Sequence, residues 1–192
     1  MARKNLKEEI VVAAVEALHR GGFNATGVQD ITAAAGAPKG SFYNHFESKE
    51  ALGVEALDRY WQGGLAWLDV LSKPDSPPLK RLKTYFRGLA RAVEGESYER
   101  GCMIGNFAVE MSASSRPIRD RLALLLAGWS RAIESCVREA QADGSMRRDM
   151  DARTIAAFLL NSWQGAMMRA KVDKDGSALE AFEAVAFKAL AP

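Results

Sequence analysis

Residues 21–49, GGFNATGVQDITAAAGAPKGSFYNHFESK, contain the pattern that decides the fold. Thr26 and Gln29 are spaced as a capping box, in which a Thr hydroxyl caps a helix and a Gln follows three residues later. The helix that they predict has one apolar face and ends at Gly36, because glycine tolerates positive φ. Pro38 then suits the first turn of a second helix, where no backbone donor is needed.

The second helix of this pair is predicted to be short, with a polar outer surface. Phe42 and Phe46 lie four residues apart, so both rings should face inward and anchor the helix. A short polar helix on two aromatic anchors contributes little to a core. It is well suited to enter the major groove of DNA, so the pattern indicates a helix-turn-helix with a recognition helix.

This segment resembles the helix-turn-helix of the TetR family of bacterial one-component transcriptional regulators. The pattern of that family is G-[FY]-x-x-T-T-V-x-x-I-A-x-x-A-G-V-S-x-G-x-x-Y-x-H-F-x-x-K-E. The residues that match it in register are Gly22, Phe23, Thr26, Val28, Ile31, Ala35, Gly36, Gly40, Tyr43, His45, Phe46, Lys49 and Glu50. The chain departs from the pattern at Gly27, Thr32, Ala37 and Pro38. The resemblance implies an all-α, TetR-like protein of about nine helices that binds double-stranded DNA as a homodimer.

The resemblance also implies contacts with DNA. Phosphates are expected to be bound by Thr26 and Lys49, by the phenol of Tyr43 and by the backbone amide of Gly40. The role of Gly40 has independent support, because glycine lets the backbone approach closely and a helix N-terminus favours an anion. Lys and Asn side chains can form hydrogen bonds with base edges. The candidates for base contacts are Lys39, Ser41, Asn44 and His45. Gln29 is expected to reach the DNA backbone or a base. For His45, a role in supporting the fold is the alternative.

Length and composition allow a full hydrophobic core. The chain has 192 residues, of which 48% are hydrophobic, and a net charge of +2. Residues 1–50 contain six Lys or Arg and six Asp or Glu, with a basic start at Arg3, Lys4 and Lys7. We therefore expect a few targeted phosphate contacts and a moderate salt dependence of DNA binding. A solvated basic N-terminus without a role is the alternative.

The composition argues against membrane, secreted and metal-binding classes. No apolar run approaches the ~20 residues of a membrane span, and the start of the chain has no signal-peptide pattern. Cys102 and Cys136 do not resemble a disulfide framework, so we expect a cytoplasmic protein with reduced thiols. The two histidines have no partners at ligand spacing, and no metal or cofactor is expected.

The remaining sequence is predicted to be helical throughout, since no segment shows the period-2 alternation of a strand. We expect a DNA-binding domain at residues 1–48 and a ligand-sensing and dimerisation domain at residues 49–192. Helix 49–71, capped by Ser48, is the expected connector, and it ends before the linker Ser72–Pro78. One apolar stripe is predicted along the connector, formed by Leu52, Leu57, Trp61, Leu65 and Leu68.

Five helices are expected after the linker. Their predicted extents are residues 79–93, residues 102–112, a long helix from Pro117 to about residue 143, a helix from Asp151 to about Lys171, and residues 179–190. In the last two helices the apolar residues exceed one narrow stripe, and Gly165-Ala166 would let another helix approach closely. In this family two such helices from each chain form the dimer interface, which we expect here. A buried terminal hairpin is the alternative.

One cysteine has the setting of a reactive thiol. Cys102 follows Gly101 at a predicted helix start, where backbone amides and the helix dipole stabilise a thiolate. Arg100 adds a nearby positive charge. Such a thiol reacts readily with electrophiles and oxidants, although a cysteine that merely packs at a helix start is the alternative. Cys136, mid-helix between apolar residues, is expected to be a small buried side chain.

Within the family the chain resembles the NemR-like branch, in the segment KGSFYNHFESKEALGVEALDRYW (residues 39–61), in Gly101-Cys102 and in a helix with Gly165-Ala166 and Lys171. That branch represses detoxification enzymes and responds to quinones, aldehydes, maleimides and chlorine oxidants through a cysteine at the matching place. The resemblance implies that Lys171 lies near the thiol, where it lowers the thiol pKa or traps a sulfenic acid. An ordinary cation in a last helical turn is the alternative. A related branch with a similar Gly-Cys segment responds to small unsaturated acids such as acrylate.

The leading hypothesis is a homodimeric repressor that leaves a palindromic operator when an electrophile or oxidant acts at Cys102. The alternative is a repressor released by a small organic ligand bound reversibly in an aromatic pocket. Four side chains are expected to line that pocket, namely Phe107, Trp129, Trp163 and Met167. An enzyme is disfavoured, because only His19 or His45 could serve Cys102 as a base and no oxyanion-hole loop is evident. A DNA-binding protein that senses nothing is a third class.

Overall fold

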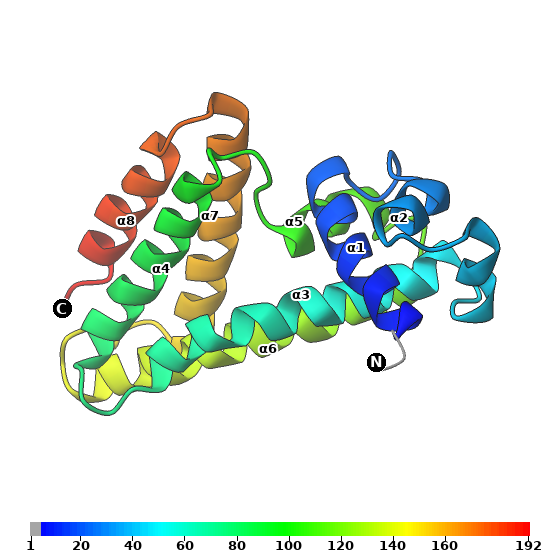
Figure 1. The fold of residues 1–192 in the computed structure, drawn as a ribbon. Helices are drawn as coiled ribbons and strands as arrows, with labels where there is room; N and C mark the ends of the chain where they lie inside the picture. Colours follow the sequence, from blue (N-terminus) through cyan, green and yellow to red (C-terminus); the bar gives the residue numbers. More distant parts are fainter. Residues whose placement is uncertain (1–4) are drawn as a thin grey trace. The chain divides into compact units, whose positions relative to one another are not determined.

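A computed structural model describes residues 5–192. In this range it contains eight α-helices and one 3₁₀ helix, and no strand (Figure 1). This confirms the all-α fold with about nine helices. Arg3 and Lys4 of the predicted basic start lie outside the described residues.

The described chain divides into two compact units. Unit 1 comprises the residues up to Gly63 together with Cys102–Leu124, and unit 2 comprises Gly64–Gly101 and Leu125–Pro192. Two long helices, α3 (Lys49–Ser72) and α6 (Arg116–Ala142), contribute residues to both units. The functional domains expected at residues 1–48 and 49–192 stay a prediction.

Unit 1 begins with α1 (Leu6–Gly21) and α2 (Val28–Ala34), joined by the α1–α2 loop, residues 22–27. The capping residue of α2 is Gly27, whose N–H donates to the Asp30 carboxylate at 2.9 Å. The predicted capping box of Thr26 and Gln29 is therefore wrong. Thr26 is buried, and its hydroxyl instead donates to the Gly22 carbonyl at 2.8 Å, because a buried hydroxyl needs an internal partner.

The second helix of the predicted pair is η1 (Lys39–Asn44), a 3₁₀ helix that follows Pro38. Gly36 ends the preceding turn with φ +64°, as its position predicted. Phe42 and Phe46 are 0% and 3% exposed, and their ring centroids lie 5.4 Å apart. The prediction of two inward-facing aromatic anchors is thus confirmed.

Helix α3 begins at the predicted cap, since the Ser48 hydroxyl accepts a hydrogen bond from the Ala51 N–H at 3.1 Å. Leu52 and Leu57 are buried, but the apolar stripe predicted through Leu65 is wrong in the second half, where Leu65 is 43% exposed. There Leu71 is the buried side chain. The buried face changes along α3 because its first half belongs to unit 1 and its second half to unit 2.

In unit 2 the helices α4 (Pro78–Gly95), α7 (Ala152–Asp173) and α8 (Ser177–Ala189) run side by side (Figure 1). Each start has a local cause: Pro78 occupies the first turn of α4, and Asp151 caps α7 by accepting from the Thr154 N–H at 3.0 Å. Aromatic rings join the three helices. The ring centroid of Phe86 in α4 lies 5.4 Å from that of Trp163 in α7 and 5.0 Å from that of Phe182 in α8.

The remaining helix of unit 1 is α5 (Met103–Met111), which begins directly after Cys102. Helix α6 starts one residue before the predicted Pro117. Among residues 5–192 no helix is long and apolar enough to cross a membrane. The same residues contain no group of three or more His, Cys, Asp or Glu side chains able to hold a metal ion.

Candidate DNA interface and sensor residues

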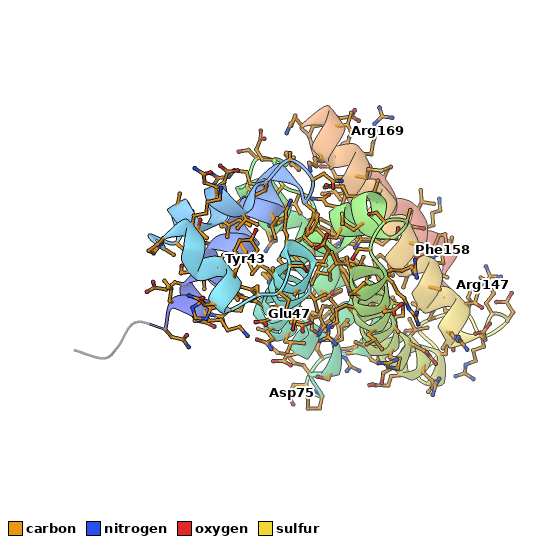
Figure 2. All side chains as sticks on the ribbon, turned by 90° about the vertical axis from the view of Figure 1, so that its right-hand side faces the viewer. Tyr43, Glu47, Asp75, Arg147, Phe158 and Arg169 are labelled. Atoms are coloured by element: carbon orange, nitrogen blue, oxygen red, sulfur yellow. The ribbon has the colours of Figure 1, made fainter. Side chains whose placement is uncertain are left out.

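The surface of η1 and α2 carries most of the side chains predicted to meet DNA. Tyr43, labelled on η1 in Figure 2, is 66% exposed. The exposed candidates are Gln29, Lys39, Gly40, Tyr43, Asn44 and His45. Ser41 is half-buried, and its hydroxyl donates to the Pro38 carbonyl at 2.6 Å. Exposure on a helix held by buried anchors is what contact with a groove requires.

Two of the exposed candidates contact each other. The Lys39 ammonium donates to the side-chain carbonyl of Gln29 at 3.4 Å, so a residue of η1 and a residue of α2 share one patch. The Tyr43 ring meets the Phe42 ring edge-on, with centroids 5.1 Å apart. Because Phe42 is fully buried, this contact orients the exposed phenol without covering it.

The predicted phosphate ligands Thr26 and Lys49 lie deeper and have internal partners. Thr26 is only 7% exposed. The Lys49 ammonium donates to the Phe23 carbonyl at 2.5 Å and lies 4.3 Å from the centroid of the Phe23 ring. Burial lowers the pKa of Lys49, while the negative charges of Glu50 and Glu110 oppose that shift. Both residues therefore hold the α1–α2 loop, and their contacts with phosphate stay a prediction.

Helix α5 also contacts the α1–α2 loop. The ring of Phe107 packs edge-on against Phe23, with centroids 5.5 Å apart, and Phe107 is fully buried. One turn later the Glu110 carboxylate accepts a hydrogen bond from the Asn24 N–H at 2.9 Å. The sequence did not reveal Glu110, because its partner lies 86 positions away and no local pattern marks the pair.

The two cysteines differ in position, and neither forms a disulfide. Cys102 is the capping residue of α5, as predicted, with its carbonyl accepting from the Asn106 N–H at 2.9 Å; its side chain is 5% exposed. Cys136 is fully buried in α6, and its thiol donates to the Pro78 carbonyl at 3.3 Å. The burial of Cys136 confirms the expected small buried side chain, and this burial raises the pKa of its thiol to about 11.

The other predicted sensor residues belong to unit 2. Trp129, Trp163 and Met167 are buried, and Lys171 is half-buried in the last turn of α7. The indole N–H of Trp163 has no hydrogen-bond partner among the described residues. Since Cys102 and Phe107 belong to unit 1, the aromatic pocket and the pairing of Cys102 with Lys171 stay predictions.

Helices α7 and α8 expose large apolar side chains. Phe158, labelled on α7 in Figure 2, is 47% exposed. Together with it the exposed apolar residues of these helices are Met168, Val172 and Val185, at 65%, 72% and 64%. A Cβ built on Gly165 would meet nothing within 4 Å, so the backbone of α7 is open to a close neighbour at this position.

Two family profiles match the chain. The family described as bacterial regulatory proteins, tetR family, matches residues 10–56, which contain α2 and η1. A second profile, described as the tetracyclin repressor-like C-terminal domain, matches residues 78–186, more than half of the chain. The chain belongs to the TetR family. This TetR-family protein thus shows the family's helix-turn-helix in the segment that carries the exposed candidates.

Individual relatives span nearly the whole chain. The HTH-type transcriptional repressor DhaR of Mycobacterium sp. (strain GP1) is 39% identical, over 100% of this chain and 96% of its own. The transcriptional regulator AcuR of Cereibacter sphaeroides is 34% identical, over 91% of this chain and 80% of its own. The crystal structure of a regulatory protein TetR from Rhodobacter sphaeroides matches with a TM-score of 0.91 at 30% identity. The match covers 97% of this chain and 100% of that structure's chain.

The NemR-like branch is a more distant match. The HTH-type transcriptional repressor NemR of Escherichia coli (strain K12) is 23% identical over 91% of this chain and 88% of its own, well below DhaR and AcuR. The comparisons therefore assign this protein to the TetR family but not to the NemR-like branch. Within it, the sequence lies closer to DhaR and AcuR than to NemR.

Proposed function

We propose that the protein is a homodimeric transcriptional repressor that binds a palindromic DNA operator through α2 and η1. The observation that carries this proposal is the cluster of exposed polar side chains on η1, a short helix fixed by the buried Phe42 and Phe46. Lys39 and Asn44 are the candidates for base edges, and Tyr43 is the candidate for a phosphate. DhaR, the relative with 39% identity, is named a repressor, which supports repression rather than activation of transcription.

Dimerisation follows from the geometry of DNA. Two recognition helices must enter successive major grooves about 34–36 Å apart, so a symmetric operator requires a twofold-symmetric protein. The exposed apolar side chains of α7 and α8 support an interface there, because a second copy would remove Phe158, Met168 and Val172 from water. The open surface at Gly165 would allow the helices to approach closely.

Release is proposed to follow covalent modification of Cys102 by an electrophile or oxidant. With an α,β-unsaturated carbonyl compound, the thiolate sulfur forms a bond to the β-carbon. The electrons of the carbon–carbon double bond move to the α-carbon, which takes a proton from water, and the thiol proton goes to solvent. Cys102 precedes α5, the helix that packs on Phe23, so modification acts at one end of an element that contacts the α1–α2 loop.

A reversible ligand is the second candidate mechanism. The buried indole N–H of Trp163 has no partner among residues 5–192, and leaving such a donor unpaired costs free energy. A ligand that carries an acceptor, such as the carboxylate of a small unsaturated acid, would satisfy it. Trp129 and Met167, which like Trp163 belong to unit 2, are the other proposed lining residues.

The test is fluorescence anisotropy on a DNA duplex that the purified protein itself selects from a random library. Stoichiometric N-ethylmaleimide is added to wild type, Cys102→Ser and Cys136→Ser. We expect release of wild type and Cys136→Ser, because the raised pKa of Cys136 keeps its thiol protonated and unreactive at neutral pH. Cys102→Ser should stay bound. Equal release of Cys102→Ser would contradict the thiol mechanism and favour a reversible ligand.

A further inference from the structure

One carboxylate from α5 holds the α1–α2 loop and lies close to its backbone. One oxygen of Glu110 accepts the Asn24 N–H at 2.9 Å. The other lies so close to Gly22 that a Cβ on that residue would come within 2.6 Å of it. Gly22 has φ +82°, a conformation that suits glycine, so the loop admits the carboxylate only because this residue has no side chain.

The residue between these two contacts is held from two sides. The Phe23 carbonyl accepts a hydrogen bond from Lys49, the first residue of α3, and the Phe23 ring packs on Phe107 of α5. A Cβ on Gly53 of α3 would come within 2.8 Å of the same ring. The position of the loop therefore depends on α3 and α5 together, through the hydrogen bonds of Lys49 and Glu110.

Helix α5 is short enough to move as one body. It runs from Met103 to Met111, and a rise of 1.5 Å per residue puts about 12 Å between the backbone positions of Cys102 and Glu110. Intrahelical hydrogen bonds link its successive turns, so we expect a displacement at its first turn to reach its last turn. Phe107 contributes apolar packing, which tolerates small shifts, whereas a hydrogen bond from Glu110 weakens steeply with distance and angle.

We infer that Glu110 is a positioning residue that couples α5 to the DNA-reading helices by fixing the Asn24 amide. Its carboxylate sets the position of the loop from which α2 begins, and through α2 the position of η1. Movement of α5 then changes operator affinity directly through the α1–α2 loop. Conversely, operator binding stabilises α5, because coupling between two sites is reciprocal. The consequence for operator binding rests on the proposed function, whereas the contacts lie within unit 1.

The test is hydrogen exchange of the full-length protein, read by mass spectrometry, with and without the self-selected DNA duplex. In wild type, DNA should slow exchange both in η1 and in α5. In Glu110→Leu, which has no acceptor, the Asn24 amide should exchange about tenfold faster or more, and DNA should slow exchange in η1 but no longer in α5. Should Glu110→Leu fail to fold, Glu110→Ala removes the acceptor without adding bulk.

Two matched variants separate positioning from general stability. Glu110→Gln keeps a side-chain carbonyl that can accept from Asn24, so it should restore the response of α5 to DNA. Val109→Thr changes the neighbouring residue of α5, which is 83% exposed, and should behave as wild type. An α5 that responds to DNA in Glu110→Leu, or a Glu110→Gln variant that behaves like Glu110→Leu, would overturn the inference.

Failure of the proposed function gives a different result. A wild-type protein that selects no DNA would overturn both the proposed function and the coupling. A wild-type protein that selects DNA but leaves exchange in α5 unchanged would overturn the coupling alone.

Discussion

At the scale of single residues, Tyr43 and Lys49 have different surroundings although both were predicted to bind phosphate. Tyr43 is 66% exposed, and nothing in the described fold depends on its hydroxyl. Lys49 holds the Phe23 carbonyl with one of its donors and has two N–H donors left for a phosphate. Substitution should therefore affect DNA binding alone at Tyr43, and both DNA binding and stability at Lys49.

We expect Tyr43→Phe to weaken binding to all DNA sequences by about two- to tenfold, the loss of one hydrogen bond, with no change in the urea midpoint of unfolding. Lys49→Ala should flatten the dependence of log affinity on log salt by about one unit and also lower the urea midpoint. Anisotropy titrations over a salt series and equilibrium unfolding measure both. If either variant altered base preference at unchanged non-specific affinity, the assignment to phosphate would be wrong.

The same scale shows why one capping prediction was wrong. Thr26 and Gln29 fit the sequence pattern of a capping box, whereas Gly27 and Asp30 supply only its reciprocal half, in which the Asp30 carboxylate accepts from the Gly27 N–H. The sequence pattern therefore favours the register that the structure does not adopt. The choice depends on burial of Thr26, whose hydroxyl reaches the Ala17 and Gly22 carbonyls, and this follows from packing that no local pattern reveals.

At the scale of elements, α3 contains glycines in contrasting environments. At Gly53 a Cβ would come within 2.8 Å of the Phe23 ring and 3.3 Å of Ile118, so this glycine leaves room for the Phe23 side chain. At Gly63 a Cβ would meet nothing within 4 Å. Both lie inside the same helix, so they differ in packing and not in backbone conformation.

Gly53→Ala is expected to lower the free energy of unfolding by about 1–3 kcal/mol through overpacking, and to weaken operator binding because Phe23 is displaced. Gly63→Ala is the matched control and should raise the free energy of unfolding by about 0.5–1 kcal/mol, since alanine favours a helix interior. Urea denaturation compares the two. A stabilised Gly53→Ala protein with intact DNA binding would show that Phe23 has room to move.

Elements also show which parts of the fold were predictable. Helix starts at the caps Ser48 and Asp151 were predicted, because a cap acts on adjacent residues, whereas Pro78 was assigned to the linker and instead begins α4. The two inward rings of η1 followed from their spacing. Contacts of α5 with the α1–α2 loop were not predicted, because residues such as Glu110 and Asn24 are paired only by the tertiary fold.

At the scale of the whole molecule, the proposed binding of a palindromic operator requires two copies of the chain. The proposed interface rests on exposed apolar side chains of α7 and α8, of which Val172 is 72% exposed. Leu124 of α6 is similarly exposed, at 62%, but lies outside these helices. Val172 and Leu124, two exposed aliphatic residues, thus provide a test and its control.

Val172→Glu should raise the dissociation constant of the homodimer at least about tenfold, because burial of an unpaired charge in the interface is unfavourable. Operator affinity should fall with it, since a monomer occupies one half-site only. Leu124→Glu should leave both unchanged. Analytical ultracentrifugation gives the oligomeric state, and a Val172→Glu protein that stays dimeric would move the interface away from this part of α7.

The indole N–H of Trp163, which has no hydrogen-bond partner among residues 5–192, makes this side chain a candidate optical probe. Emission from an indole in apolar surroundings lies towards the blue, and a hydrogen-bond acceptor arriving at its N–H shifts emission towards the red. A ligand that binds reversibly beside Trp163 would therefore report its arrival in the intrinsic fluorescence spectrum, without any attached dye. Candidate inducers can thus be screened by the emission spectrum of the unmodified protein, to which Trp163 contributes as one of four tryptophans, before the operator is known.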